Sequence, residues 1–579
     1  MLLQYGKRVS PGMARVAQRR VAGIAVSTLS PWTRSNAGRT SFASRFYTTT
    51  FPALSTHQIS QIKGKKANFH SSVHRNKASS VFVDLNDTHD TASSSSSSSS
   101  SSQNPLPDFD DAQASFATKT TAELYRSALT YNICQLTFLV EHAESLLNLT
   151  RRLLGDWFTD TLLKATLFGH FCAGTDRENI RPAIKSLEHS GIGSILDFAA
   201  EDDGETPSRF KPKPHTTEAR LSSEDTMPYP ESDTRKQTPV RVYDYLSEAK
   251  CDQHLQDFRK CIRDVASLGN DGYAAVKITA LGSPELLKKM STAIVEAQKL
   301  FAKFDTNGDG LISPEEFEEQ YRKYFDVDES IIRQLKDDLR CTETGHVDYI
   351  TWSMTISPRD LPRITCACRE QGPLYLATPT SEELELMENM YSRGRALAEE
   401  AATYGTRLLI DAEQVRFQPA IDNLVTTLQQ TYNSTDTATF PLIYNTYQCY
   451  LKDSLDRLRL DVERSERFNY HFGAKLVRGA YMKQEGKLAE EQEYPNPIHD
   501  SIENTHQSYN DAVDFLMEHA SRENGKNTEV MLATHNRESI EKAIDCMNKY
   551  GIDRHATTTS FGQLFGMADN VSATNFWTS

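Results

Sequence analysis

GAKLVRGAYM at residues 473–482 and VMLATHN at residues 530–536 are the stretches that decide the fold. Each begins as a short apolar run and stops at a cluster of cationic, small and hydrogen-bonding residues. A strand of a parallel sheet is covered on both faces, so its sequence is continuously apolar rather than alternating. Both stretches are therefore predicted to be buried parallel strands that carry functional side chains at their carboxyl ends.

The same pattern occurs at five other places, and amphipathic helical stretches lie between most of them. This alternation predicts a parallel sheet covered by helices. A doubly wound sheet and an eight-stranded barrel both fit the alternation. Polar groups at nearly every strand end favour a TIM-like (β/α)8 barrel, in which the active-site residues come from one rim. The predicted strands are 191–201, 273–281, 406–414, 441–450, 473–481, 528–536 and 557–566.

The first part of the chain has the composition of a targeting segment. Residues 1–83 contain thirteen Lys or Arg and no Asp or Glu, and they are rich in Arg, Ser and Ala. This is typical of a mitochondrial transit peptide, and a disordered basic tail that binds an anionic partner is the alternative. The unbroken serine run at 93–102 cannot bury apolar surface and predicts a flexible linker over 84–117.

The remaining residues are expected to form one interrupted barrel. Residues 118–284 would hold N-terminal helices and the first two strands, with two or three helices over 121–155 and a surface loop at 202–240. Residues 285–390 form an insertion that carries a motif of its own. Residues 391–579 would hold the other strands.

Composition narrows the classes of partner. The formal net charge of −14 argues against general nucleic-acid binding. No run of 18 apolar residues occurs, so no membrane-spanning helix is expected, although peripheral membrane contact stays open. The nine cysteines are scattered and odd in number, which argues against a disulfide framework and a zinc site.

DTNGDGLISPEE at residues 305–316 matches a calcium-binding loop, and sequences of helical pattern flank it. A hard cation needs six or seven oxygen ligands, and a glycine at the sixth place allows the sharp turn. One Ca²⁺ is therefore expected within an EF-hand, with an acidic surface loop as the alternative. The expected ligands are Asp305, Asn307, Asp309, Leu311 through its carbonyl, Ser313 through water, and Glu316.

RCTETGHVDYIT at residues 340–351 has the outline of a second loop of this kind. Arg340 stands in place of the first acid, and Thr351 stands in place of the final glutamate. Too few anionic oxygens remain for a cation, so this second hand is expected to be a structural partner.

The strand ends together resemble those of mitochondrial-type proline dehydrogenases, some of which carry an EF-hand insertion. The resemblance covers roughly residues 120–570 and rests on an ordered series of motifs, each of which is weak alone. They are VKITALG (276–282), LLIDAEQ (408–414), NTYQCY (445–450), KLVRGAYM (475–482), ATHN (533–536) and GQLFGM (562–567).

The resemblance implies a distorted (β/α)8 barrel with FAD on its rim and L-proline as substrate. A hydride would leave the ring carbon next to the proline nitrogen for the flavin. Lys277 would lie in the active site, whereas alone it could be a lysine that snorkels to the surface. Asp411 would be an active-site anion that bonds Lys277 or a tyrosine, with a helix N-cap as the alternative. Ala480 and Tyr481 would line the substrate pocket.

The resemblance also implies a set of residues around the flavin. Lys475 and Arg478 would supply positive charge that stabilises the reduced anionic ring, although bacterial relatives usually exchange Arg and Lys at these places. Taken alone, His535 would more often be a hydrogen-bonded core histidine. No G-x-G-x-x-G fingerprint of a nicotinamide-binding domain occurs. The implied FAD contacts are Gln448, Lys475, Arg478, Thr505, Thr534, His535, Asn536 and Gln563.

The last predicted strand is followed by a short tail. The chain ends at Ser579, thirteen residues after Gly566, and ADNVSATNFWTS contains no arginine. Relative to the family, the eighth strand and the last helix, with the paired arginines that clamp the substrate carboxylate, are expected to be missing.

The function that follows is FAD-dependent oxidation of L-proline to 1-pyrroline-5-carboxylate, with electrons passed to a quinone or another respiratory-chain acceptor. The expected location is the mitochondrial matrix, in contact with the inner membrane. Two alternatives stay open: a hydroxyproline dehydrogenase, and a catalytically silent calcium-binding protein that keeps the barrel.

Overall fold

The computed structural model describes residues 108–572. Within this range it leaves out 117–118, 175–176, 190–191, 198–247, 269–271, 327–328, 342–344, 523–527, 554–555 and 557. The basic segment 1–83, the serine run and the loop expected at 202–240 thus lie outside the described residues. The short helix α5 (Ala112–Ser115) falls inside the range 84–117 that the sequence assigns to the linker.

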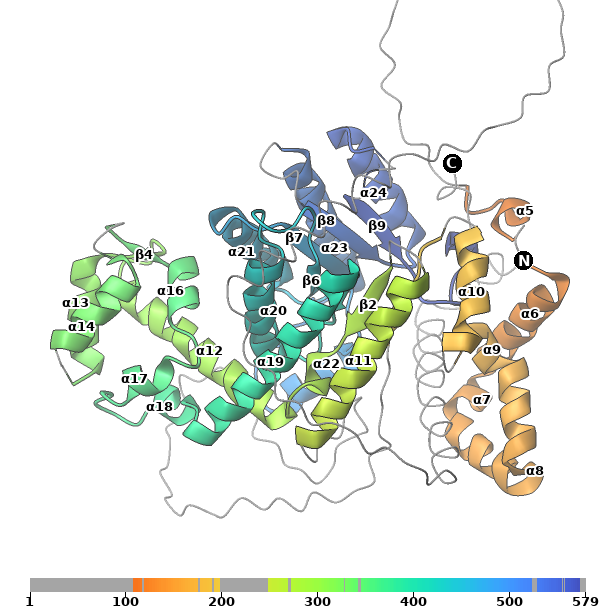
Figure 1. Ribbon diagram of the computed structural model, residues 1–579, viewed down its shortest axis with the longest axis horizontal. Helices are drawn as coiled ribbons and strands as arrows, with labels where there is room; N and C mark the ends of the chain where they lie inside the picture. The colour runs from red at the N-terminus through yellow and green to blue at the C-terminus, as the bar shows by residue number, and fades with distance from the viewer. Residues whose placement is uncertain are drawn as a thin grey trace, which may run out of the picture. The chain divides into compact units, whose positions relative to one another are not determined.

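All seven predicted strands are present, and they form one parallel sheet in chain order, β1-β2-β5-β6-β7-β8-β9 (Figure 1). A doubly wound sheet would reverse its strand order at a switch point, so that alternative is excluded. The strands are β1 (Ile195–Asp197), β2 (Tyr273–Val276), β5 (Arg407–Ile410), β6 (Ile443–Gln448), β7 (Phe472–Val477), β8 (Thr528–Ala533) and β9 (Thr559–Gly562).

The sheet is curled. In a flat sheet β2 and β9 would be separated by five strand spacings, or roughly 24 Å. The hydroxyl of Tyr273 on β2 nevertheless lies 3.4 Å from that of Ser560 on β9. Arg407 on β5 forms a buried ion pair with Glu529 on β8 at 3.0 Å. Within the described residues β1 and β9 are the two edges of the sheet, so the observed part of the barrel is open.

The strands β2, β5, β6, β7, β8 and β9 end before their predicted carboxyl ends, because the residues that follow leave the hydrogen-bonded ladder. After β2, for example, residues Ile278–Ala280 form the 3-10 turn η1 instead of continuing the strand. The side chains at these ends are therefore carried by turns that the strands position.

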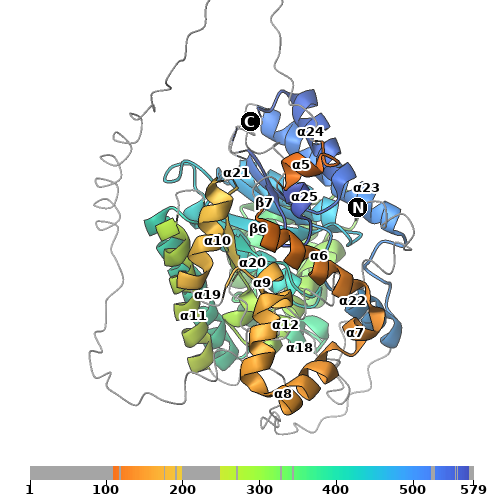
Figure 2. The ribbon, with the colours of Figure 1, turned by 90° about the vertical axis from the view of Figure 1, so that its right-hand side faces the viewer.

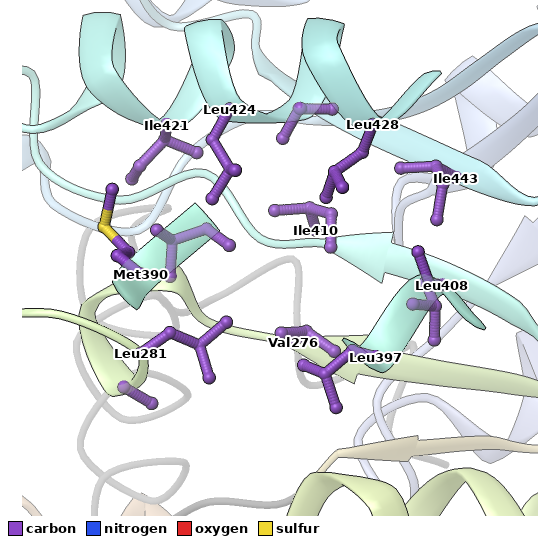
Figure 3. Close-up of a cluster of buried hydrophobic side chains, with 14 of the residues drawn as sticks. Val276, Leu281, Met390, Leu397, Leu408, Ile410, Ile421, Leu424, Leu428 and Ile443 are labelled. Atoms are coloured by element: carbon purple, nitrogen blue, oxygen red, sulfur yellow. The ribbon is translucent and has the colours of Figure 1, made fainter. Parts of the chain in front are cut away.

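Helices lie between the strands and cover the outer face of the sheet. The best-defined apolar layer lies where α19 and α20 pack on β2 and β5, with Val276, Leu408 and Leu424 almost fully buried (Figure 3). The helices concerned are α11 (Glu248–Leu268), α12 (Pro284–Phe304), α19 (Ser381–Tyr404), α20 (Gln418–Tyr432), α21 (Ser454–Arg467), α22 (Met482–Glu491), α23 (Ile502–Ser521) and α24 (Arg537–Tyr550).

The region before β1 is helical, as the sequence predicts for its first part (Figure 2). The Tyr131 hydroxyl on α6 donates to the Gly566 carbonyl at 2.5 Å, so this region lies against the residues after β9. None of the described helices is both long and apolar enough to cross a membrane. These N-terminal helices are α6 (Thr121–Gln135), α7 (Thr137–Glu141), α8 (Ala143–Ala165), α9 (Leu167–Phe171) and α10 (Arg177–His189).

The insertion has a core of its own. The loop at 305–316, which follows α12, and the second loop at 340–351 are joined by a two-stranded antiparallel sheet in which Ile312 faces Val347. The indole nitrogen of Trp352 donates to the Ala297 carbonyl at 3.0 Å, and Arg467 on α21 pairs with Asp348 at 2.5 Å. The other insertion elements are β3 (Leu311–Ile312), α13 (Pro314–Tyr324), α14 (Glu329–Asp338), β4 (Val347–Asp348), α16 (Tyr349–Thr355), α17 (Leu361–Thr365) and α18 (Pro373–Ala377).

Candidate active site

The carboxyl ends of the strands bring together most of the residues that the sequence singles out. Neighbouring parallel strands are in register, so their ends share one edge of the sheet. The backbone amide of Asp411, for instance, donates to the Val276 carbonyl at 2.9 Å, which sets the end of β5 beside the end of β2. The predicted residues at or directly after a strand end are Lys277, Asp411, Gln448, Arg478, Thr534 and Gln563.

Lys475 on β7 and Asp411, directly after β5, form an ion pair at this edge of the sheet, with Nζ of the lysine 2.7 Å from Oδ1 of the aspartate. Their side chains are 16% and 18% exposed, so the pair is largely removed from water. Asp411 was expected to bond Lys277 or a tyrosine, or to cap a helix. Its hydrogen-bonded ion partner is Lys475, and the N-cap of the following helix α20 is Phe417.

Glu413 is a buried carboxylate two residues further along. It accepts hydrogen bonds from both the amide and the hydroxyl of Thr279, at 3.0 and 2.6 Å. Its own carbonyl accepts from Nε2 of Gln448 at 2.7 Å. Burial raises the pKa of Glu413, while the hydrogen bonds from Thr279 and the positive charge of Lys277 oppose the rise. Lys277 itself is buried at the end of β2.

Arg478, directly after β7, is held at several points. Its guanidinium donates to Nδ1 of His506 at 2.9 Å, to the Thr534 hydroxyl at 2.8 Å and to the Ser539 hydroxyl at 2.7 Å. It also lies over the ring of Tyr509, 4.4 Å from the ring centroid. These contacts fix a cation at the edge between β7 and β8.

The turn after β8 carries Thr534, His535 and Asn536. The side chain of Gln563 reaches it from the end of β9 and donates to the Thr534 carbonyl at 3.2 Å. Asn536 caps α24 by accepting from the Ser539 amide at 2.9 Å. His535 accepts from the Leu564 amide through Nε2 at 3.3 Å, whereas its buried Nδ1 has no hydrogen-bond partner among the described residues. Burial lowers the pKa of His535.

Three other predicted residues do not directly follow a strand end. Ala480 and Tyr481 lie in the turn between β7 and α22, and Tyr481 is the N-cap position of that helix. The preceding Gly479 has φ of +121°, and a Cβ there would lie 1.5 Å from the ring of Tyr450. Thr505 is buried within α23, where its hydroxyl donates to the Ser501 carbonyl at 3.4 Å.

Sequence reasoning missed Glu413, Thr279 and His506. Glu413 and Thr279 stood inside the quoted motifs LLIDAEQ and VKITALG, so a polar residue in an apolar turn was the available signal. No local pattern marks His506, since its partner Arg478 is 28 residues away in sequence.

The loop at 305–316 is a second, separate candidate site. Asp305 accepts from the amides of Gly308 and Gly310, each at 2.9 Å, and both glycines have positive φ. The Glu316 carboxylate is engaged with the hydroxyls of Ser313 and Thr306 at 3.0 and 2.7 Å. Within the described part of the chain, no three His, Cys, Asp or Glu side chains stand together as a metal cluster.

The chain is similar to known proteins over most of its length. The sequence model of the family described as proline dehydrogenase matches residues 288–576. Human "Proline dehydrogenase 1, mitochondrial" is 33% identical over 496 residues, which cover 81% of each chain. The protein of the same description from Caenorhabditis elegans is 32% identical over 80% of this chain and 79% of its own.

Two more distant similarities complete the comparison. A "Hydroxyproline dehydrogenase" of Xenopus laevis is 27% identical over 79% of this chain and 77% of its own. The crystal structure of proline utilization A from Bdellovibrio bacteriovorus superimposes with a TM-score of 0.43 at 13% identity. That match covers 80% of this chain and 33% of the bacterial one. By its identity to the mitochondrial enzymes over four fifths of both lengths, the chain belongs to the proline dehydrogenase family, a family of oxidoreductases.

Proposed function

We propose that this protein oxidises L-proline to 1-pyrroline-5-carboxylate with FAD as its cofactor. The observation that carries the proposal is the 33% identity to human proline dehydrogenase 1 over 81% of both chains. The gathering of the predicted residues at one edge of the sheet supports it independently, because an active site of this fold class is built from strand ends.

The residues at this edge fit a flavin. Lys475 and Arg478 place two cations on and directly after one strand, which suits a group that becomes anionic on reduction. In the part of the chain that the structure describes, the buried Nδ1 of His535 has no hydrogen-bond partner, and it can take one from a ligand. When bound, FAD supplies the acceptor for the two electrons that proline loses. Gln448, Thr534 and Gln563 would contribute hydrogen bonds, and Asn536 and Thr505 further contacts.

The protein's own residues would bind and orient the proline. Lys277 would balance the charge of the substrate carboxylate, while Asp411 holds Lys475 in place through their ion pair. Ala480 and Tyr481, in the turn after β7, would shape the wall against which the ring lies. Burial of Lys277 and of most of the Lys475–Asp411 pair keeps water away from these charges and strengthens their electrostatic contacts.

The names of the relatives support a cellular location for the protein. Human, fly and worm proteins named "Proline dehydrogenase 1, mitochondrial" support a mitochondrial location, and the basic segment 1–83 would be the transit peptide. A quinone or another respiratory-chain carrier would take the electrons. Peripheral contact with the inner membrane from the matrix side would bring the protein to that acceptor.

The test is anaerobic reduction of the purified, FAD-loaded protein. L-Proline is expected to bleach the flavin absorbance near 450 nm, with one 1-pyrroline-5-carboxylate formed per flavin reduced. D-Proline and glycine serve as matched controls. A protein that binds FAD but is not bleached by L-proline at any concentration would overturn the proposal.

A second candidate substrate is trans-4-hydroxyproline, which the similarity to the Xenopus hydroxyproline dehydrogenase favours. The same assay decides between the two amino acids. A higher kcat/KM for L-proline supports the first proposal, and a higher value for trans-4-hydroxyproline supports the second. A colourless protein that still binds Ca²⁺ would point to the catalytically silent alternative.

We also propose that the loop at 305–316 binds one Ca²⁺ as the first hand of an EF-hand pair. All its candidate ligands are oxygens, from Asp305, Asn307, Asp309, Leu311, Ser313 and Glu316, which suits a hard cation. Glu316 would have to turn from the Ser313 cap toward the ion, since it is engaged there. The second loop, with Arg340 and Thr351, would act as its structural partner.

Calorimetric titration with Ca²⁺ tests this second proposal. One site per chain is expected, and Glu316→Gln should weaken it by at least roughly tenfold because the twelfth position gives two oxygens. The matched control is Glu319→Gln, on the same helix but outside the loop. Absence of heat and of a Ca²⁺-dependent rise in melting temperature would contradict it.

A further inference from the structure

Glu413 occupies an unusual place in the strand-end cluster, the group of side chains at the carboxyl edge of the sheet that comprises Lys277, Thr279, Asp411, Glu413, Gln448, Lys475, Arg478, Thr534 and Gln563. The residue is only 4% exposed, and both of its carboxylate oxygens accept hydrogen bonds from one residue, Thr279. Thr279 belongs to the turn η1 that directly follows Lys277. The carboxylate therefore ties the turn that carries Lys277 to the end of the neighbouring strand β5.

The main chain of Glu413 extends the link to the next strand. Its carbonyl accepts from Gln448 Nε2 at 2.7 Å, and its amide donates to Gln418 Oε1 at 3.0 Å. One residue thus connects the ends of β2, β5 and β6 and the start of α20. Because Nε2 of Gln448 is used in this contact, the orientation of its amide group is set.

Placing a carboxylate here has an energetic cost that local structure alone does not require. Burial favours the neutral acid and raises the pKa of Glu413, and the charge of Asp411 adds to this effect. The hydrogen bonds from Thr279 and the charge of Lys277 act against it. Neutral residues could close a turn of this kind without a buried charge, and perturbed carboxylates of this type are concentrated at functional sites.

We propose that Glu413 is a positioning residue of the active site: it anchors Thr279, and through that turn it holds the Lys277 ammonium where the substrate carboxylate binds. The role rests on the proposed proline oxidation for its catalytic consequence. The anchoring itself can be measured without turnover.

The anchoring is tested by hydrogen–deuterium exchange of peptides covering residues 273–282. Thr279→Val removes the hydroxyl bond, while Thr279→Ser retains it. Faster exchange in this segment for Thr279→Val and Glu413→Gln, with the wild-type rate for Thr279→Ser, is expected. Unchanged exchange in both of the first two variants would overturn the proposal.

The consequence for substrate is tested by steady-state kinetics of the FAD-loaded enzyme. Glu413→Gln keeps the shape of the side chain but removes its charge, and we expect KM for L-proline to rise roughly tenfold, with a smaller change in kcat. The matched control is Glu485→Gln, another buried carboxylate, which accepts from the Val415 amide at 2.9 Å and should retain the wild-type KM.

The two arms separate the possible failures. If L-proline does not reduce the wild-type flavin, the proposed function fails, and the exchange measurement still decides whether Glu413 anchors the turn. If the wild type is active and Glu413→Gln has an unchanged KM, the positioning role is overturned.

Discussion

The strand-end cluster and the loop at 305–316 are both built from charged and hydrogen-bonding side chains, but they are held together differently. In the cluster, the Lys475–Asp411 pair joins residues 64 positions apart, and both side chains are mostly buried. In the loop, Asp305 bonds amides at most five residues away, and its surroundings are exposed. The first site draws its side chains from several strands, whereas the candidate ligands of the second come from twelve consecutive residues.

This difference predicts how each region responds to substitution. A change in the curled sheet or in its strand-end cluster leaves buried groups without partners and should lower the free energy of unfolding. Apart from Ile312, the side chains of the loop are exposed to water or only half-buried, so a substitution there should have little effect on the free energy of unfolding and should mainly weaken ion binding. The following substitutions test that contrast.

The largest effect is expected for Arg407→Leu, at the amino end of β5 in the sheet that carries the strand-end cluster, because it leaves Glu529 buried without its ion partner. The free energy of unfolding should fall by about 3–5 kcal/mol. Urea denaturation followed by circular dichroism measures the change. The double variant Arg407→Leu/Glu529→Leu should recover part of it, and a double variant less stable than the single one would contradict the curled arrangement.

Gly479→Ala should have the next largest effect. Its φ of +121° is strained for any L-residue, and the added Cβ would overlap the ring of Tyr450. We expect a loss of at least about 2 kcal/mol in the free energy of unfolding, from strain and overpacking together. A melting temperature equal to that of the wild type would show that the turn after β7 differs from the one described.

The pH dependence of stability tests the burial of His535. Because burial lowers its pKa in the folded state, the unfolded chain takes up more protons below about pH 6.5, the ordinary value for histidine. The stability contributed by neutral His535 is thus present above that pH and is lost as the pH falls below it.

Denaturation of the wild type and His535→Asn between pH 7 and pH 5 measures this contribution. The wild type should lose stability more steeply on acidification, by up to about 1.4 kcal/mol per pH unit, the limit for one proton. The loop at 305–316 contains no histidine and should not contribute. If the free energy of unfolding of the two proteins changed equally with pH, the burial of His535 would be contradicted.

The smallest effect is expected for Gly310→Ala in the loop. Its φ is +82°, but a Cβ there would meet no atom of the described residues within 4 Å. Only the backbone strain remains, so the free energy of unfolding without Ca²⁺ should fall by about 1 kcal/mol. A loss as large as that of Gly479→Ala would remove the contrast between the two regions.

The same contrast explains what the sequence could predict. The seven strands could be predicted from apolar runs, because that signal is local. The spacing in residues 305–316 is also a local signal, and calcium binding there stays a prediction. The carboxyl end of β2, for example, was predicted too far along the chain, since Ile278 and Ala280 of η1 are as apolar as the strand they follow. The pairing of Lys475 with Asp411 and the anchoring of Thr279 by Glu413 depend on strand register, which no local pattern contains.

The measurement that tests the central claim most directly is the rate of anaerobic flavin reduction by L-proline in three FAD-loaded proteins. They are the wild type, Lys475→Met from the strand-end cluster and Glu316→Gln from the loop. Removal of the Lys475 charge should slow reduction on the order of 100-fold, whereas Glu316→Gln should react like the wild type. Reduction of Lys475→Met at the wild-type rate would contradict the assignment of the active site to the strand ends.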